Sequence, residues 1–180
     1  MPDPSLSEAI REAYAVAPSD VIIHHTLELR HPAFVDDDGN ATAIRVVRDH
    51  QNLTARLEAS APMDSGEMVA FIAMGFELEL PPVDTVPVPE ITVTLDNVSR
   101  ELVKHLDAAV TSQEKIEITY RPYLSNDLEG PQMDPPLTLI LTEVEASIFR
   151  ITGRARMLNI GKKAFPSEVY TAKRFPGLSR

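Results

Sequence analysis

The sequence predicts a mainly β fold, a twisted β-barrel or sandwich that carries two short helices, one of them at its edge, and extended arms. Most apolar residues of the 180-residue chain alternate with polar ones in short segments, a period of two that is typical of strands. Only two segments show helical spacing instead. The stretch PPVDTVPVPE, with four prolines, predicts a stiff extended connection rather than a central strand. Short strands with few helices favour a barrel or sandwich.

The first element is a predicted helix over residues 5–17. Ser5 and Glu8 have the spacing of a capping box, and Pro18 ends the helical pattern. One face of this helix is apolar, formed by Leu6, Ala9, Ile10, Ala13 and Ala17. The segment is therefore an amphipathic helix with a face to bury.

Four strands are predicted next, over residues 20–30, 43–49, 52–59 and 67–81. The segment HPAFVDDDGNAT between the first two predicts a turn, in which Asp38-Gly39-Asn40 supplies positive φ angles. Its acidic run predicts a hairpin tip rather than a calcium loop, because the spaced acids and the distal glutamate of an EF-hand are missing. Adjacent His24 and His25 must point to opposite faces of their strand, so they cannot share a metal.

The stretch PEITVTLDNVSRELVKHL, residues 89–106, changes its period in the middle. Its first half alternates like a strand, whereas its second half places Leu102 and Leu106 on one face of a helix. Asp96 and Asn97 stand at the change, and either side chain can cap the helix. We expect a structural joint there, with both leucines buried against the sheet.

The last strands are predicted over residues 114–124 and, as a pair with a weak turn between 145 and 148, over 137–160. A loop separates them at residues 125–136. The predicted organisation is a helical arm, a β-rich core domain and an extended basic tail, over residues 1–19, 20–160 and 161–180.

The net charge of −10 is distributed unevenly along the chain. From Arg150 onward there are eight basic residues and one acid, a net charge of +7, whereas residues 1–149 carry nine basic and twenty-six acidic residues, a net charge of −17. Such a basic segment either docks on an acidic partner, including another copy of the chain, or forms a solvated strand face with local pairing. Both interpretations stay open at this point.

The sequence contains no recognisable catalytic, cofactor or metal motif, and we expect the protein not to be an enzyme. With no cysteine it can form neither disulfides nor thiolate metal sites, and the five histidines lack metal-binding spacing. Serine-elbow and phosphate-loop motifs are also missing. Adjacent Asp49 and His50 form the one acid–base pair worth testing for hydrolysis. No nucleic-acid or membrane partner is expected, given the acidic balance and the shortness of the apolar runs.

Several segments, in this order, resemble a family of bacteriophage and prophage tail-tip proteins, short counterparts of the phage lambda minor tail protein L. They are LELRHPAF (27–34), AIRVVRDHQNLTARLE (43–58), FELELPP (76–82), PEITVTLDNVSRELVKHL (89–106), YRPYLSND (120–127) and AFPSEVYTAKRFPGL (164–178). The resemblance implies a β-barrel or sandwich of the tail-hub type. The cysteine-ligated iron–sulfur region of lambda L has no counterpart here, so no cofactor is implied.

The resemblance also implies a structural component of a siphophage-type tail tip or baseplate hub, made in the bacterial cytoplasm and located in the virion tail. Copies would form a ring, expected to be a homotrimer, between the tail-tube end and the central hub or fibre. An assembly chaperone is the alternative, and a cell-wall hydrolase a weaker one.

We expect the subunit interface to use residues of the basic C-terminal segment: Arg154, Arg156, Lys162, Lys163, Lys173, Arg174, Phe175 and Leu178. Phe175 and Leu178 flank a Pro-Gly turn ringed by basic residues, which is the pattern of a docking anchor. The alternative is that Phe175 plugs the barrel of its own subunit.

Overall fold

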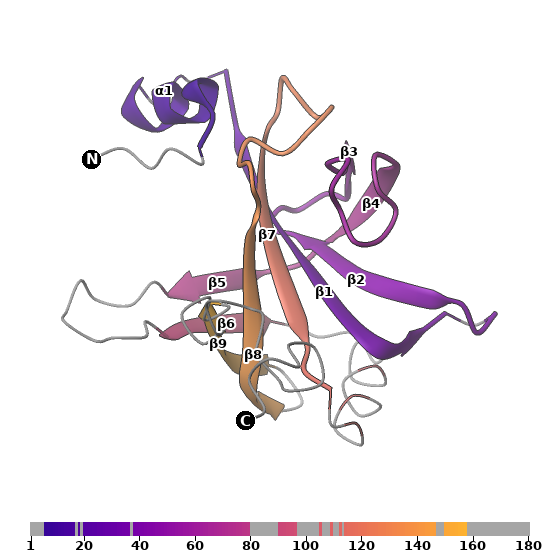
Figure 1. The fold of residues 1–180 in the computed structure, drawn as a ribbon. Helices are drawn as coiled ribbons and strands as arrows, with labels where there is room; N and C mark the ends of the chain where they lie inside the picture. The colour runs from indigo at the N-terminus through magenta and orange to yellow at the C-terminus, as the bar shows by residue number, and fades with distance from the viewer. Residues whose placement is uncertain are drawn as a thin grey trace, which may run out of the picture.

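A single nine-stranded sheet dominates the computed structural model, with strand order β3-β4-β2-β1-β7-β8-β9-β6-β5 (Figure 1). The model describes residues 6–16, 18, 20–36, 38–79, 90–96, 105, 109, 112, 114–146 and 150–157. All strand pairs are antiparallel except β2 with β4, and the pairings do not close the sheet. The prediction of a mainly β fold is therefore confirmed.

The described elements follow the chain in a simple order. They are α1 (Glu8–Val16), β1 (Ile23–Val35), β2 (Ala41–Val47), β3 (Leu53–Arg56), β4 (Met68–Ala73), β5 (Phe76–Glu79), β6 (Glu90–Asp96), β7 (Glu117–Leu124), β8 (Leu137–Ala146) and β9 (Arg150–Met157).

Strand β1 is longer than the sequence predicted, so the predicted turn over residues 31–42 was too long: residues 31–35 belong to β1 and residues 41–42 to β2. The side chain of Phe34 is completely buried in the core, which holds this part of the chain against the sheet. The register shifts between Arg30 and Val35, an irregularity that accommodates Pro32. Burial of an aromatic ring here outweighs the local turn preference of a His-Pro pair.

Among the described residues, the turn is confined to 36 and 38–40. Its tip is an acidic hairpin, as predicted, in which the Asp36 carboxylate accepts the backbone N–H groups of Asp38 at 3.0 Å and Asn40 at 2.8 Å. The positive φ angle belongs to Gly39 (84°), whereas Asp38 and Asn40 do not share it.

The predicted strand over residues 67–81 is two strands, because the chain breaks at Met74 and Gly75. Strand β4 pairs with β2 and β3, whereas β5 pairs with β6 at the opposite end of the strand order. These two residues thus connect the two ends of the sheet, which curls so that β5 and β6 run across β7 and β8 (Figure 1). The alternation of buried residues also changes at the break. Val69 and Phe71 are buried before it and Phe76 after it, and an uninterrupted strand would place odd and even positions on opposite faces.

The main core lies on one face of the curled sheet. Leu27 and Leu29 of β1 belong to it, and their register partners on β2 and β7 include Val46 and Ile118. Strands β5, β6, β8 and β9 add side chains to the same cluster. A second cluster, centred on Phe71 and Tyr123, fills the space beside β3 and β4.

Helix α1 is present but begins at Glu8, and its cap is Ser7, a correction to the predicted Ser5 capping box. The Ser7 hydroxyl oxygen accepts the Ile10 N–H at 3.3 Å, and the Ser7 N–H donates to the Gln132 carbonyl at 2.9 Å. Ile10 is completely buried against Leu124. The helix therefore packs on its own subunit.

The strand–helix joint is described only in part. Asp96 ends β6 as predicted, whereas Asn97, Leu102 and Leu106 lie outside the described residues. His105 and Ala109 are helical, and Ala109 is buried in the main core.

Gly153 on β9 marks a point where the sheet has no room for a side chain. A Cβ atom there would lie 2.6 Å from Leu141 Cδ1 and 3.4 Å from the Glu143 carbonyl oxygen. We expect Gly153→Ala to lower the free energy of unfolding by about 1–3 kcal/mol in urea titration. Leu141→Val should recover part of this loss when combined with it, and strictly additive losses would contradict the clash.

Candidate functional site

Of the eight predicted interface residues, two are among those that the structure describes. Arg154 and Arg156 are exposed on β9, and the Arg154 guanidinium lies 3.5 Å from the Glu143 carboxylate of the same subunit. In the register, Arg156 stands opposite Glu90. Six predicted interface residues lie outside the described residues: Lys162, Lys163, Lys173, Arg174, Phe175 and Leu178. In the sheet register, each of the two β9 arginines is thus paired with an acidic position on a neighbouring strand.

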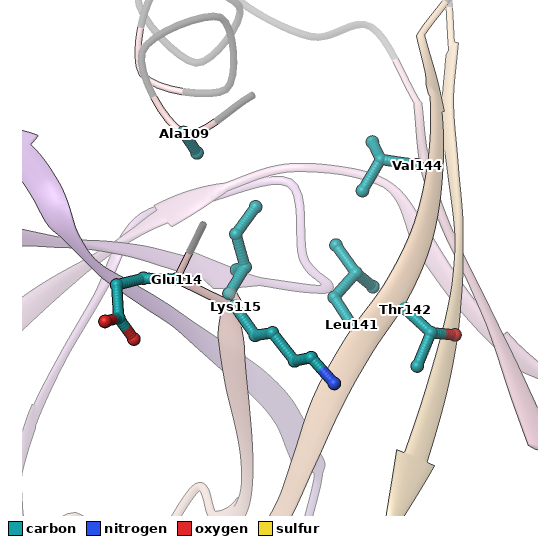
Figure 2. Close-up of a pocket in the computed structure, with 7 residues that line it drawn as sticks. Ala109, Glu114, Lys115, Leu141, Thr142 and Val144 are labelled. Atoms are coloured by element: carbon teal, nitrogen blue, oxygen red, sulfur yellow. The ribbon is translucent and has the colours of Figure 1, made fainter. Parts of the chain in front are cut away.

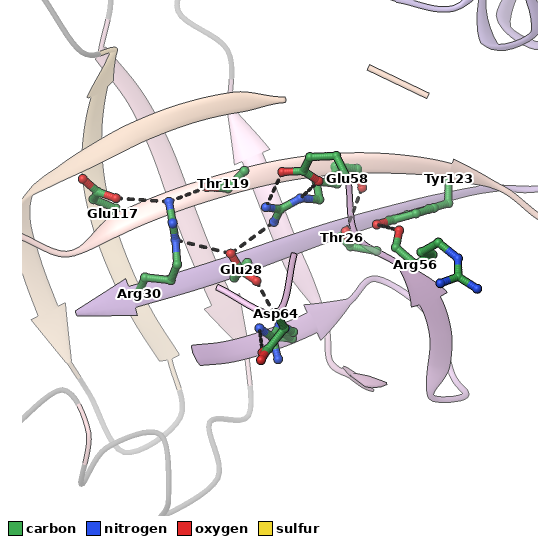
Figure 3. Close-up of polar contacts among 11 residues, drawn as sticks. Thr26, Glu28, Arg30, Arg56, Glu58, Asp64, Glu117, Thr119 and Tyr123 are labelled. Atoms are coloured by element: carbon green, nitrogen blue, oxygen red, sulfur yellow. Dashed lines mark hydrogen bonds and ion pairs between the residues drawn. The ribbon is translucent and has the colours of Figure 1, made fainter. Parts of the chain in front are cut away.

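The face of β1 opposite the main core carries a buried ion cluster (Figure 3). Its centre is Glu28, whose side chain is fully buried. Three arginines surround the Glu28 carboxylate: Arg45 at 2.8 Å, and Arg30 and Arg121 both at 3.3 Å. Alternation places them together, because these residues share one face of β1, β2 and β7.

Each arginine of this Glu28 cluster also binds a second carboxylate. The partners are Glu58 for Arg121 at 2.7 Å, Asp64 for Arg45 at 2.6 Å and Glu117 for Arg30 at 3.1 Å. Two of these partners, Glu58 and Asp64, belong to the loop of residues 57–67 between β3 and β4. One buried carboxylate cannot balance three guanidinium groups, so the loop carboxylates complete the neutralisation. The cluster therefore fastens this loop to the sheet.

The chemistry of the Glu28 cluster is that of a structural element. Burial raises the pKa of Glu58, but hydrogen bonds from Arg121 outweigh it and hold the pKa below its ordinary value. A carboxylate in this state is a poor proton donor or acceptor near neutrality. Sequence reasoning missed the cluster because Glu28 alternates with apolar neighbours and so resembles a solvent-facing residue.

This lowered pKa predicts a loss of stability in acid. The Glu58 contribution is present above its unfolded value of about 4.5 and is lost as pH falls through the lower folded pKa. We expect urea midpoints to fall more steeply between neutrality and acid for the native chain than for Glu58→Gln. Glu129→Gln, which removes an exposed carboxylate paired with Arg56, is the control and should keep the native pH profile.

A pocket of about 250 Å³ opens on the other face of the sheet. Its apolar walls come from four strands: Phe76 of β5, Ile91 of β6, and Leu137 and Leu139 of β8, with the Tyr120 ring of β7. Phe76, Ile91 and Leu139 are buried, so they form the floor. The curl of the sheet creates this cavity, because it brings β5 and β6 over β7 and β8.

Polar groups gather at one side of this β7–β8 pocket. His25 Nδ1 lies 2.7 Å from the Tyr120 hydroxyl oxygen, and Tyr14 of α1 also lines the pocket. Burial, then the charges of Arg48 and His24, lower the pKa of His25, so its imidazole is neutral near pH 7. Because a neutral imidazole nitrogen accepts better than a phenol oxygen, the Tyr120 hydroxyl donates to Nδ1. Burial also raises the pKa of Tyr120.

A second pocket, about 290 Å³, lies beside β8, near Ala109 and the residues just before β7 (Figure 2). The Lys115 side chain reaches toward β8, whereas the Glu114 carboxylate points away from it. Ile116 and Leu141 supply apolar lining. No group of reactive side chains converges there among the residues that the structure describes.

The sequence suggested an acid–base pair of Asp49 and His50, but in the structure Asp49 pairs with His24. The Asp49 carboxylate lies 3.0 Å from His24 Nδ1, and its contact with His50 is a hydrogen bond from the backbone N–H of that residue, not from the imidazole. His24 and His25 point to opposite faces, as predicted. No cluster of three or more potential metal ligands occurs among the described residues.

None of the helical segments within the described residues has the length and apolar character needed to cross a membrane. Comparison with curated proteins finds no match to the chain. A protein-family model matches residues 9–170, which is most of the sequence, and describes them as a domain of unknown function, DUF1833. The chain therefore belongs to the DUF1833 family.

Proposed function

We propose that this protein is a structural component of a siphophage-type tail tip, located in the virion tail. The observation that carries the proposal is the ordered series of segments, from LELRHPAF to AFPSEVYTAKRFPGL, that resembles tail-tip proteins. These segments extend over nearly the whole chain from about residue 20. Each is weak alone, but their order and spacing together are specific.

The curled sheet supports a scaffolding role. The Glu28 cluster fastens the 57–67 loop, and α1 packs on the same subunit through Ile10, so the described core is tied together by long-range contacts. In this proposal the curl corresponds to a barrel of the tail-hub type, with Met74 and Gly75 leading from one end of the strand order to the other. A rigid unit of this kind suits a ring that must carry load.

The distribution of charge supports head-to-tail assembly. An acidic body and a basic C-terminal segment lie on different parts of the chain, which suits a heterologous interface that closes by rotation. We infer a homotrimeric ring that contacts the tail tube on one side and the hub or fibre on the other. Nucleic acid and membrane are not partners in this proposal.

Mass spectrometry of finished phage particles tests the proposal directly. A structural ring protein is expected in tails at a fixed low copy number, together with tube and hub proteins. Its absence from particles, with assembly still dependent on it, would identify an assembly chaperone instead. Clearing of purified cell wall by the protein, lost in His24→Ala, would establish the hydrolase.

Deletion of residues 173–180 tests the predicted docking anchor. Docking predicts a folded, soluble subunit with an unchanged melting temperature that no longer enters tails. If Phe175 plugs its own subunit, the isolated protein should melt several degrees lower. A truncation that enters tails normally and keeps the native melting temperature would argue against both roles.

A further inference from the structure

Arg48 is an exposed cation at the mouth of the β7–β8 pocket. Within the described part of the chain, no carboxylate and no hydrogen-bond acceptor contacts its guanidinium group, whereas Arg30, Arg45 and Arg121 are all paired with carboxylates. Its neighbour in sequence, Asp49, is engaged by His24 instead. A guanidinium group left beside an apolar cavity is a ready binding partner for an anion.

We propose that the β7–β8 pocket binds a small carboxylic acid with an apolar body, whose carboxylate pairs with Arg48. The apolar body rests on Phe76, Ile91 and Leu139, and the carboxylate lies at the rim. This site does not depend on the proposed assembly role, since none of the predicted interface residues is among its lining residues.

The polar side of the pocket favours an anion over a cation. The neutral His25 accepts the hydrogen bond of the Tyr120 hydroxyl at Nδ1, so its own proton is on Nε2, which is a hydrogen-bond donor. Tyr14 is 55% exposed at the rim and adds a hydroxyl group. No acidic side chain is among the residues described as lining the pocket, so none of these residues repels a carboxylate.

The size of the cavity limits the ligand to a small molecule. Its volume of about 250 Å³ lies below the roughly 300–1,000 Å³ of pockets that take drug-sized ligands. A single ring or a short branched chain with one carboxylate therefore suits it. A mostly apolar pocket with a few convergent polar groups is the usual form of such sites.

Titration calorimetry with phenylacetate and its uncharged analogue phenylacetamide tests the proposal on the full-length protein. The native protein should bind phenylacetate at least about tenfold more tightly than the amide, the effect of one charge-assisted pair. Arg48→Gln should abolish this preference while the weaker binding of the amide persists. Leu137→Trp, which fills the half-buried wall of the cavity, should abolish binding of both compounds.

Arg56→Gln is the matched control, because it removes an arginine of equal charge that pairs with Glu129 outside the pocket. It should bind both compounds like the native protein. The proposal is overturned if the native protein binds neither compound at millimolar concentration, or if Arg48→Gln keeps the preference for the acid. These outcomes leave the role in the tail tip untouched.

Discussion

Glu28→Gln is expected to lower the free energy of unfolding by about 3–5 kcal/mol, because it removes the central anion of a buried ion cluster. The amide has nearly the shape of the carboxylate, so packing is preserved. Its NH₂ group, however, would face the guanidinium donors of Arg30, Arg45 and Arg121. The three cations would then repel one another without a shared counterion. Urea titration at neutral pH measures this loss.

The matched control is Glu143→Gln, which removes a carboxylate of similar size from an exposed pair with Arg154. Water already solvates both partners there, and the change should cost less than about 1 kcal/mol. A loss of similar size for both variants would show that solvent reaches Glu28. Protection from hydrogen exchange in the 57–67 loop should also fall in Glu28→Gln, because its arginine anchors are disturbed.

Phe34→Ala should cost about 3–5 kcal/mol, the range for truncating a fully buried aromatic side chain. The Phe34 ring lies 5.4 Å, centre to centre, from both the His31 and the His105 rings. Its loss would open a cavity between the end of β1 and the helical residue His105. Thermal and urea unfolding both report the change.

Val35→Ala provides the comparison at the next position. Val35 is 45% exposed, on the opposite side of the strand from Phe34, so its truncation should cost less than about 1 kcal/mol. Equal effects at the two positions would mean that residues 31–35 do not alternate as a strand. The pair of variants therefore tests the extension of β1 that the sequence did not predict.

Local patterns predicted the elements whose causes are local. The alternation of Ile91, Val93 and Leu95 indicated β6, and all three side chains are buried. The acidic hairpin tip followed from Gly39 and its neighbours. Both features depend on residues within a few positions of each other. The start of α1 was misplaced by a few residues, because Ser7 is fixed by Gln132, more than a hundred positions away.

By itself, the sequence determined the mainly β class, most of the strands, and the opposite directions of His24 and His25, because side-chain period follows from backbone geometry alone. Only the tertiary structure decided which faces are covered. Period two separates Glu28 from Leu27 and Leu29, but it cannot show that the 57–67 loop closes over the polar face. The break at Met74 and Gly75, the pairing of Asp49 with His24, and the position of Arg48 at a pocket likewise depend on long-range contacts. Such contacts arise when the sheet curls, and no local pattern encodes that curl.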